Sequence, residues 1–222
     1  MFPTRGVANR GSVGGLLRRT ALIVAVAGVA MAAGPTVTAA SDGSAAQQLV
    51  QQVTTTIIDE LTERRDALQN DPQAVYELVH RLVLPHFDFE RMSRRVIGKK
   101  RWNAATPAQR TQFVSAFRTL MVRTYAVMLN EYRGQALSWL DPMPRKKENE
   151  FVIPVTIELA GGAPARVDYA MHGSGSDWKV FDVALDGVSL VRNYRSSFRS
   201  ELARHGIDGL IASIEAKNAA MN

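Results

Sequence analysis

Carboxylates are the side chains of this sequence best suited to chemistry. The candidates are Asp88, Asp168, Asp182 and Asp186. An aspartate on the inward face of a strand, beside a tyrosine, can act as a general base, as in small isomerases built on cone-shaped folds. The structural alternative is that Asp88 caps a helix and that Asp182 pairs with Arg192 or Arg195, because a buried carboxylate needs a partner. The sequence favours this structural interpretation.

The other polar residues form no recognisable catalytic or metal-binding motif. No two histidines have metal-ligand spacing with a third ligand nearby; they are His80, His86, His172 and His205. Residues 173–176 (GSGS) resemble a nucleophile turn but lack the strand-to-helix elbow, so they predict a hairpin loop. The sequence has no cysteine, which excludes disulfides and thiolate metal sites. We therefore expect neither an enzyme nor a metal protein.

Two short basic clusters remain, residues 99–101 (KKR) and 145–147 (RKK). Most such runs are solvated loops; a functional run would steer the protein towards anionic lipid headgroups or acidic partner surfaces, and salt would weaken the effect. The whole chain has 27 Lys+Arg and 21 Asp+Glu, but the segment 1–40 holds four arginines and no acid. The remainder is nearly balanced and has no nucleic-acid-reading motif, which excludes a nucleic-acid-binding protein.

The segment 1–40 has the pattern of an export signal. Its arginines precede an apolar segment, residues 21–33 (ALIVAVAGVAMAA), that is too short to span a membrane comfortably. Small residues at 37–40 offer cleavage positions, so the mature chain is expected to start at Ala40 or Ser41; a retained anchor is the alternative. We expect residues 1–40 to be a signal peptide and residues 41–222 to be one domain.

The positions of these groups depend on elements that the hydrophobic pattern predicts. Apolar residues at helical spacing predict helices over 47–68, 72–84, 89–97 and 107–132. Asp71, Asp88 and Thr106 are the expected caps, and Gln109 completes a capping box with Thr106. Residues 99–102 are expected to form a basic turn.

After residue 134 the pattern changes from helical to alternating. It predicts strands over 136–140, 151–159, 165–171 and 178–185, with Pro154 at an edge or a bulge. A helix over 190–202, a break at 206–209 and a short terminal helix from Leu210 follow. The predicted fold is α+β with a sequential antiparallel sheet of three or four strands. A twisted sheet roofed by helices tends to enclose a cone-shaped hollow.

Two blocks of motifs carry a resemblance to a known family. They are LP at 84–85 and DF at 88–89, continuing through Gly98, Trp102, ATPAQR at 105–110 and Gly134, and then WKVFDV at 178–183, GVSL at 187–190, NYRSSF at 193–198 and GIDGL at 206–210. In their order and spacing these motifs resemble those of the MlaC family of periplasmic phospholipid-binding proteins, also called toluene-tolerance auxiliary proteins. The resemblance covers the chain from about Gln47 to its end.

The resemblance implies a function in transport and no enzymatic activity. It implies a cone-like (NTF2-like) domain that holds acyl chains between its sheet and helices, with bound phospholipid as cargo and no cofactor. It also implies a soluble periplasmic carrier that maintains outer-membrane lipid asymmetry. The implied partners are an outer-membrane lipoprotein complex and an inner-membrane ABC transporter complex with MCE-type subunits. A hopanoid-type cargo, or an isomerase-like enzyme with Asp88 or Asp182 as base, is the alternative.

Motif matching also suggests residues for the lipid site. The last strand turns into a helix at Val188 and Leu190, which we expect at the pocket. The other expected lining residues are Met92, Phe117, Leu120, Met121, Val155, Ile157, Val167, Tyr169 and Val183. Ordinary core packing is the alternative for each, and the strand face that meets the pocket is left open. Arg110 and Arg166 are candidate headgroup or partner contacts, with solvated surface charge as the alternative.

The cargo sets a requirement on the size of the pocket. A diacyl lipid has roughly 30 methylene groups, and each costs about 0.8 kcal/mol to leave in water. A carrier must therefore avoid roughly 25 kcal/mol of exposure. We expect a deep, dry pocket of about 1,000 Å³ or more.

Overall fold

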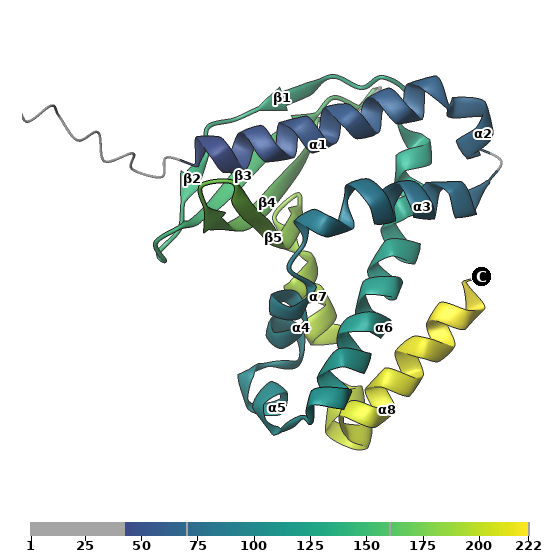
Figure 1. The fold of residues 1–222 in the computed structure, drawn as a ribbon, viewed down its shortest axis with the longest axis vertical. Helices are drawn as coiled ribbons and strands as arrows, with labels where there is room; N and C mark the ends of the chain where they lie inside the picture. Colours follow the sequence, from purple (N-terminus) through teal and green to yellow (C-terminus); the bar gives the residue numbers. More distant parts are fainter. Residues whose placement is uncertain (1–42, 70, 160, 222) are drawn as a thin grey trace, which may run out of the picture. The chain divides into compact units, whose positions relative to one another are not determined.

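The computed structural model describes residues 43–69, 71–159 and 161–221. The expected signal peptide and its cleavage positions lie outside these residues. The described chain forms helices, then an antiparallel sheet, then helices again, which confirms the α+β class (Figure 1). Among its helices, none combines the length and the apolar character that a membrane span requires. The NTF2-like detail stays a prediction.

Most helices that precede the sheet lie where periodicity predicts them. They are α1 (Ser44–Glu63), α2 (Arg65–Gln69), α3 (Pro72–Leu82), α4 (Phe89–Ile97), α5 (Lys99–Ala104) and α6 (Pro107–Tyr125), with 3₁₀ segments η1 (Leu84–His86) and η2 (Ala126–Glu131). The helix expected over 47–68 is divided at Arg64, whose φ of −113° and ψ of 23° leave the helical region. The turn expected at 99–102 is wrong: Gly98, at a φ of 84°, ends α4 and the chain starts α5 at once.

The helix starts follow from their caps. The Asp71 carboxylate accepts from the Ala74 amide at 3.1 Å, and the Asp88 carboxylate accepts from the Arg91 amide at 2.8 Å. The Thr106 hydroxyl accepts from the amide of Gln109 at 3.2 Å, while the Gln109 side chain accepts from the Thr106 amide at 2.9 Å. All three predicted caps are confirmed.

The capping box of α6 gives the first testable prediction. Thr106→Ala removes a side-chain acceptor from the first turn of this long helix, and such a loss costs about 1 kcal/mol of stability. We expect urea denaturation to show this decrease in the free energy of unfolding. Thr111→Ala is the matched control, because the exposed Thr111 hydroxyl donates only to the Pro107 carbonyl within the same helix. Equal losses in the two variants would contradict the assignment.

The sheet is antiparallel and sequential, as predicted. Its strands are β1 (Leu137–Trp139), β2 (Met143–Pro144), β3 (Glu150–Ile157), β4 (Ala165–Ser174), β5 (Asp177–Leu185) and β6 (Val188–Ser189). Their order is β1-β3-β4-β5-β6, and β2 also pairs with β3. The described strands outnumber the three or four expected because β2 and β6 have two residues each, too few to show alternation.

Pro154 lies opposite an interruption of the sheet edge. Its carbonyl accepts from the Leu140 amide at 3.1 Å, at the point where β1 has ended and β2 has not begun. In an antiparallel strand the amide and carbonyl of one residue point to the same side. The position where Pro154 has no N–H therefore faces the interrupted edge, which explains why a proline is tolerated in this strand.

The two faces of the sheet differ in character because side chains alternate along each strand. Val167, Tyr169 and Met171 of β4 lie on one side, which we call the apolar face. Asp168 and Ala170 lie on the other side, the polar face. Helix α1 runs along the sheet (Figure 1) and packs on its apolar face.

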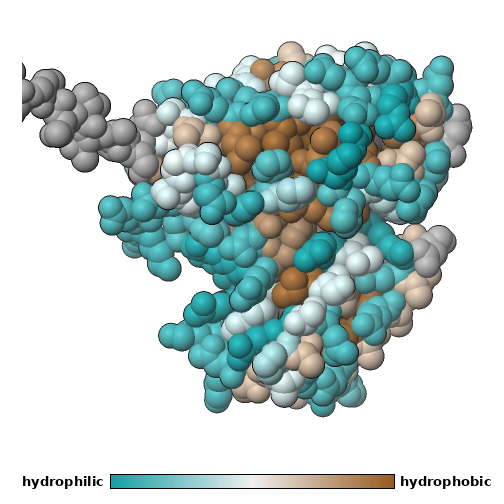
Figure 2. Space-filling view, viewed as in Figure 1, coloured by the Kyte–Doolittle hydropathy of each residue, from teal (hydrophilic) through white to brown (hydrophobic). Residues whose placement is uncertain are grey.

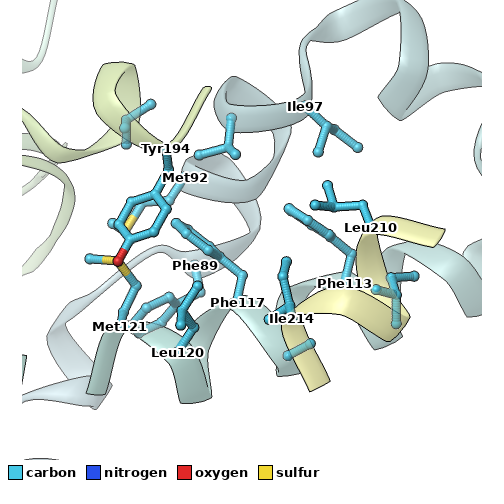
Figure 3. Close-up of a cluster of buried hydrophobic side chains, with 14 of the residues drawn as sticks. Phe89, Met92, Ile97, Phe113, Phe117, Leu120, Met121, Tyr194, Leu210 and Ile214 are labelled. Atoms are coloured by element: carbon cyan, nitrogen blue, oxygen red, sulfur yellow. The ribbon is translucent and has the colours of Figure 1, made fainter. Parts of the chain in front are cut away.

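A separate helical core lies beside the sheet. It is formed by α4, α6, α7 (Leu190–Ser197) and α8 (Arg199–Ala220), and Figure 3 shows its interleaved side chains. Helix α8 is bent at Gly206, whose φ of 66° and ψ of −163° are not helical, so the predicted break is confined to this one residue. The Asn218 amide donates to the Ala116 carbonyl at 3.0 Å, which attaches α8 to α6.

Candidate functional site

A cavity of about 300 Å³ lies between α1 and the apolar face of the sheet. Strands β4 and β5 form one wall, α1 forms the opposite wall, and α3, η1, η2 and the end of α6 supply the other lining residues. Figure 2 shows a continuous apolar surface along α1 and between α1 and α3. The wall contains no arginine, lysine, aspartate or glutamate among the described residues. Such a cavity suits a hydrocarbon ligand.

Helix α1 contributes a regular apolar stripe to this cavity. Leu49, Val53 and Ile57 recur every four residues, so they lie on one face of the helix and line the wall together. Towards the start of α1, Ala46 and Val50 are buried against the sheet in a cluster with Phe151. The close approach of α1 leaves a volume below the value of about 1,000 Å³ or more expected for a diacyl cargo.

The titratable groups on the wall are held uncharged. Burial lowers the pKa of His86, and the nearby positive charge of Lys179 lowers it further. Burial raises the pKa of Tyr125 to about 12, and its interaction with Tyr194 adds to the increase. Burial also raises the pKa of Tyr169. The cavity therefore presents neutral groups at neutral pH, as an apolar ligand requires.

The shift of Tyr125 predicts a loss of stability in alkali. Its folded pKa of about 12 lies above its ordinary value of 10.0. The contribution of Tyr125 to the free energy of unfolding is therefore fully present below pH 10 and is lost as the pH rises towards 12. We expect urea denaturation to show a steeper decline over this range than in Tyr125→Phe. Absorbance titration of tyrosine ionisation should place one tyrosine near pH 12 in the native protein and lose that step in the variant. Identical titration curves would refute the assignment.

Five of the expected lining residues lie on the wall of this cavity. They are Met121, Val167, Tyr169, Val183 and Leu190. They come from α6, β4, β5 and the first residue of α7, so the fold brings together residues that lie far apart in the sequence. The alternation of β4 is the sequence signal for Val167 and Tyr169, and the motif at 187–190 is the signal for Leu190.

The remaining expected lining residues lie elsewhere. Met92, Phe117 and Leu120 are buried in the helical core, where Figure 3 shows them packed against other side chains. Val155 and Ile157 lie on β3, outside the lining of the cavity. Val188 is 59% exposed on β6 and is not part of the wall.

The two expected arginines also lie away from the cavity. The Arg110 guanidinium donates to the Trp102 carbonyl at 2.9 Å and lies over the Trp102 ring, 5.6 Å from its centroid, so it joins α6 to α5. The Arg166 guanidinium pairs with Asp168 at 2.8 Å on the polar face. Neither position points to a headgroup contact at the cavity wall.

Helix α1 is the part of the site that sequence reasoning missed. Its apolar stripe predicts a helix but no lining residue was expected on it, and the same holds for Val79 of α3 and Val83 before η1, which also line the cavity. The available signal is the length of the stripe, which continues along most of 47–68: its first turns pack on the sheet, and Leu61 and Leu68 pack with α3. The length of the apolar stripe could have marked α1 as a cavity wall.

The carboxylates that could support catalysis have structural partners. Asp88 caps α4 and also lies 2.8 Å from Nε2 of His172. The expected pairing of Asp182 with an arginine is wrong: its carboxylate accepts from the Ser189 hydroxyl at 2.6 Å and from the Val191 amide at 3.1 Å. The start of α7 supplies these donors, so no arginine is needed. Within the described residues, no cluster of histidine and carboxylates could hold a metal ion.

Comparison with known families gives evidence that is independent of this geometry. Residues 51–216, more than half of the chain, match the family model described as MlaC protein. The chain belongs to the MlaC family. This membership confirms the resemblance inferred from the motifs. Family membership also confirms the expectation that the chain is not an enzyme, because its relatives are described as phospholipid-binding or transport-system proteins.

Two curated relatives of the MlaC family are similar over most of their length. Toluene tolerance protein ttg2D of Pseudomonas putida is 27% identical over 214 residues, which is 93% of this chain and 95% of the relative. The intermembrane phospholipid transport system binding protein MlaC of Haemophilus influenzae is 25% identical over 171 residues, covering 75% of this chain and 79% of the relative.

A solved structure shares the fold. The phospholipid-binding protein of Ralstonia solanacearum, determined in complex with a phospholipid, superposes with a TM-score of 0.69 at 27% sequence identity. The superposition covers 81% of this chain and 98% of the other. The MlaC-type arrangement of helices and sheet is therefore the same in a protein that holds a phospholipid.

Proposed function

We propose that this protein is a soluble periplasmic carrier that holds the acyl chains of a phospholipid between α1 and the apolar face of the sheet. The observation that carries the proposal is the uncharged apolar cavity at this place. A relative with the same fold was determined with a phospholipid bound, which supports the choice of cargo. Burial of roughly 30 methylene groups supplies ample driving force, at about 0.8 kcal/mol each.

Loading requires α1 to move away from the sheet. A cavity of about 300 Å³ lies at the lower end of ligand sites, and two acyl chains need several times this volume. Two polar contacts join α1 to other described elements at exposed positions: the Gln47 side chain donates to the Leu140 carbonyl at 2.8 Å, and Glu60 pairs with Arg81 at 2.9 Å. Both lie at exposed positions, where such contacts contribute little. Helix α1 is therefore the wall that can yield to a larger cargo.

We further propose that the carrier moves its cargo between the outer and inner membranes. The name of the Haemophilus influenzae relative, an intermembrane phospholipid transport system binding protein, supports this function. The partners would be an outer-membrane lipoprotein complex and an inner-membrane ABC transporter complex with MCE-type subunits. Export by the expected signal peptide at residues 1–40 would bring the mature protein to the periplasm. Fractionation of cells that produce the full chain tests this location, and a cytoplasmic product would contradict it.

The decisive experiment identifies the bound ligand. The protein is purified without detergent from bacterial cells that produce the full chain, and solvent extracts are examined by mass spectrometry. We expect about one phospholipid per protein, as for a single carrier site. Recovery of a hopanoid would identify a different lipid as the cargo, whereas recovery of no lipid at all would contradict the proposal.

A further inference from the structure

The opposite side of the sheet carries a second, larger concavity, which we call the polar groove. Its volume is about 1240 Å³. The polar face of the sheet supplies a floor of small and apolar side chains, Val152, Ala170 and Ala184. Helices α4 and α7 and the segment between β2 and β3 form its walls. The sheet separates this groove from the apolar cavity, so the groove is not part of the cargo site.

Basic residues dominate the described lining of the polar groove. Eight of its residues are arginine or lysine, and five are aspartate or glutamate. The basic residues are Arg91, Arg94, Arg95, Lys99, Arg145, Lys147, Arg192 and Arg195. The two basic clusters noted in the sequence meet here, because Lys99 lies at one wall and Arg145 and Lys147 lie at another.

Most of the acidic residues in the groove are already engaged. Asp88 contacts His172, Asp168 pairs with Arg166, and Asp182 accepts hydrogen bonds at the start of α7. The buried Glu150 pairs with both Arg91 and Arg145. The cations are less satisfied: within the described part of the chain, no ion pair involves Arg94, Arg95, Lys99, Lys147 or Arg195. The groove therefore has an excess of uncompensated positive charge.

An aromatic ring holds three of these arginines in place. The β4–β5 register shifts at Ala170, so Phe181 is an extra residue in β5. The guanidinium carbons of Arg91, Arg95 and Arg145 lie 4.2, 4.3 and 5.5 Å from the centroid of its buried ring. A guanidinium fixed over an aromatic ring keeps its N–H groups available for carboxylates.

Arg95 shows the electrostatic cost of this arrangement. Burial lowers the pKa of its guanidinium, and the neighbouring charge of Arg91 lowers it further. Glu150 and Asp182 offset part of this effect, but a half-buried cation beside two other arginines gains from an anionic ligand more than a solvated one does. The groove is therefore arranged to receive negative charge.

The distribution of these cations indicates the kind of ligand. They come from α4, α7 and the segment before β3, so a single small anion would reach only a few of them. A flat membrane surface would not reach a floor recessed between two helices. The chain's own segment 1–40 has four arginines and no acid, so its charge is of the wrong sign. We propose that the polar groove binds an acidic polypeptide segment of a partner protein.

Such a segment would place its carboxylates on the arginines of the walls and its apolar side chains on the floor. The binding would be independent of the cargo, because the two sites lie on opposite faces of the sheet. Added salt would weaken the binding, because exposed charges contribute most of it.

The test measures binding of a fluorescein-labelled oligoglutamate peptide to the purified full-length protein by fluorescence anisotropy. The matching oligoglutamine peptide is the neutral control. We expect the Arg94→Gln/Arg195→Gln variant to bind oligoglutamate at least about tenfold more weakly, because it removes two cations from the groove. The control variant Arg101→Gln/Arg204→Gln loses the same charge at exposed positions outside the groove, and we expect less than about a twofold change for it.

Three results would overturn the proposal. The first is an unmodified protein that fails to bind oligoglutamate at low salt, and the second is equal weakening by the two double variants. The third concerns the ligand: inorganic phosphate or vesicles of phosphatidylglycerol could show the groove-dependent binding while oligoglutamate does not. That result would assign the groove to phosphate chemistry instead of an acidic protein. The lipid content of each variant, measured in parallel, keeps this test separate from the cargo proposal.

Discussion

The Val183→Glu variant is expected to be purified without lipid. Val183 lies on the sheet wall of a cavity that has no charged side chain among its described residues. A carboxylate at this place would have no partner and would face the acyl chains, and an unpaired buried charge is strongly unfavourable. We expect the ratio of lipid to protein to fall at least about tenfold, which corresponds to only about 1.4 kcal/mol. Mass spectrometry of solvent extracts measures this ratio.

Val188→Glu is the matched control for this experiment. It makes the same change a short distance further along the chain, but Val188 is 59% exposed and lies outside the cavity wall. We expect this variant to keep its full lipid load and its thermal stability. Circular dichroism should show both variants folded. A full load in Val183→Glu, or an equal loss in Val188→Glu, would refute the position proposed for the cargo.

The second large effect concerns stability. Phe117→Ala should lower the free energy of unfolding by about 3–5 kcal/mol, the usual cost of removing a fully buried phenylalanine. The Phe117 ring is 0% exposed and lies 5.8 Å from the Phe113 ring, 5.3 Å from Tyr194 and 6.3 Å from Phe198, measured between centroids. Urea denaturation measures the change, with circular dichroism as the probe.

Leu159→Ala serves as the comparison, because Leu159 is 45% exposed and should change stability by no more than about 0.5 kcal/mol. The two variants also distinguish two functions of Phe117. A core residue destabilises the fold when it is truncated, whereas a lining residue would mainly change the lipid load. A stable Phe117→Ala protein with reduced lipid would contradict the packing described for the helical core.

Local signals predicted the helix starts well because each depends on a few adjacent residues. Asp71, Asp88 and Thr106 all cap helices as the sequence indicates. The helical state of residues 99–104 was missed because Gly98 marks an end without showing that another helix begins immediately. Trp102 explains this start: it is buried in the helical core, and that long-range packing is invisible to local propensity.

The strand alternation was predicted, but the face that meets the cavity was left open. Each face of this sheet borders a concavity, one apolar and one basic, so polarity along β3 does not identify the cavity side. Val155 pairs directly with Val167, yet only Val167 lines the cavity. The difference arises from the position of α1, which no pattern within the strands can reveal.

The helical candidates show the same limitation. Met121 is buried in the helical core and also lines the cavity, whereas Leu120, its neighbour in the chain, is buried in the core and is not part of the cavity wall. Successive residues of a helix point about 100° apart, so a broad apolar arc on α6 can serve two different surroundings. The sequence shows that the arc is broad but does not show where one surrounding ends and the other begins.

The alternation along β4 has a consequence for how the protein can change over evolutionary time. Tyr169 faces the proposed cargo site and Ala170, the next residue, faces the proposed partner site. The sheet backbone thus separates the residues proposed to bind lipid from those proposed to bind a partner, so substitutions on one face need not alter binding on the other. Lineages with unlike membranes could change the carried lipid through Val167, Tyr169 and Met171 of β4 without changing the side chains that face the proposed partner.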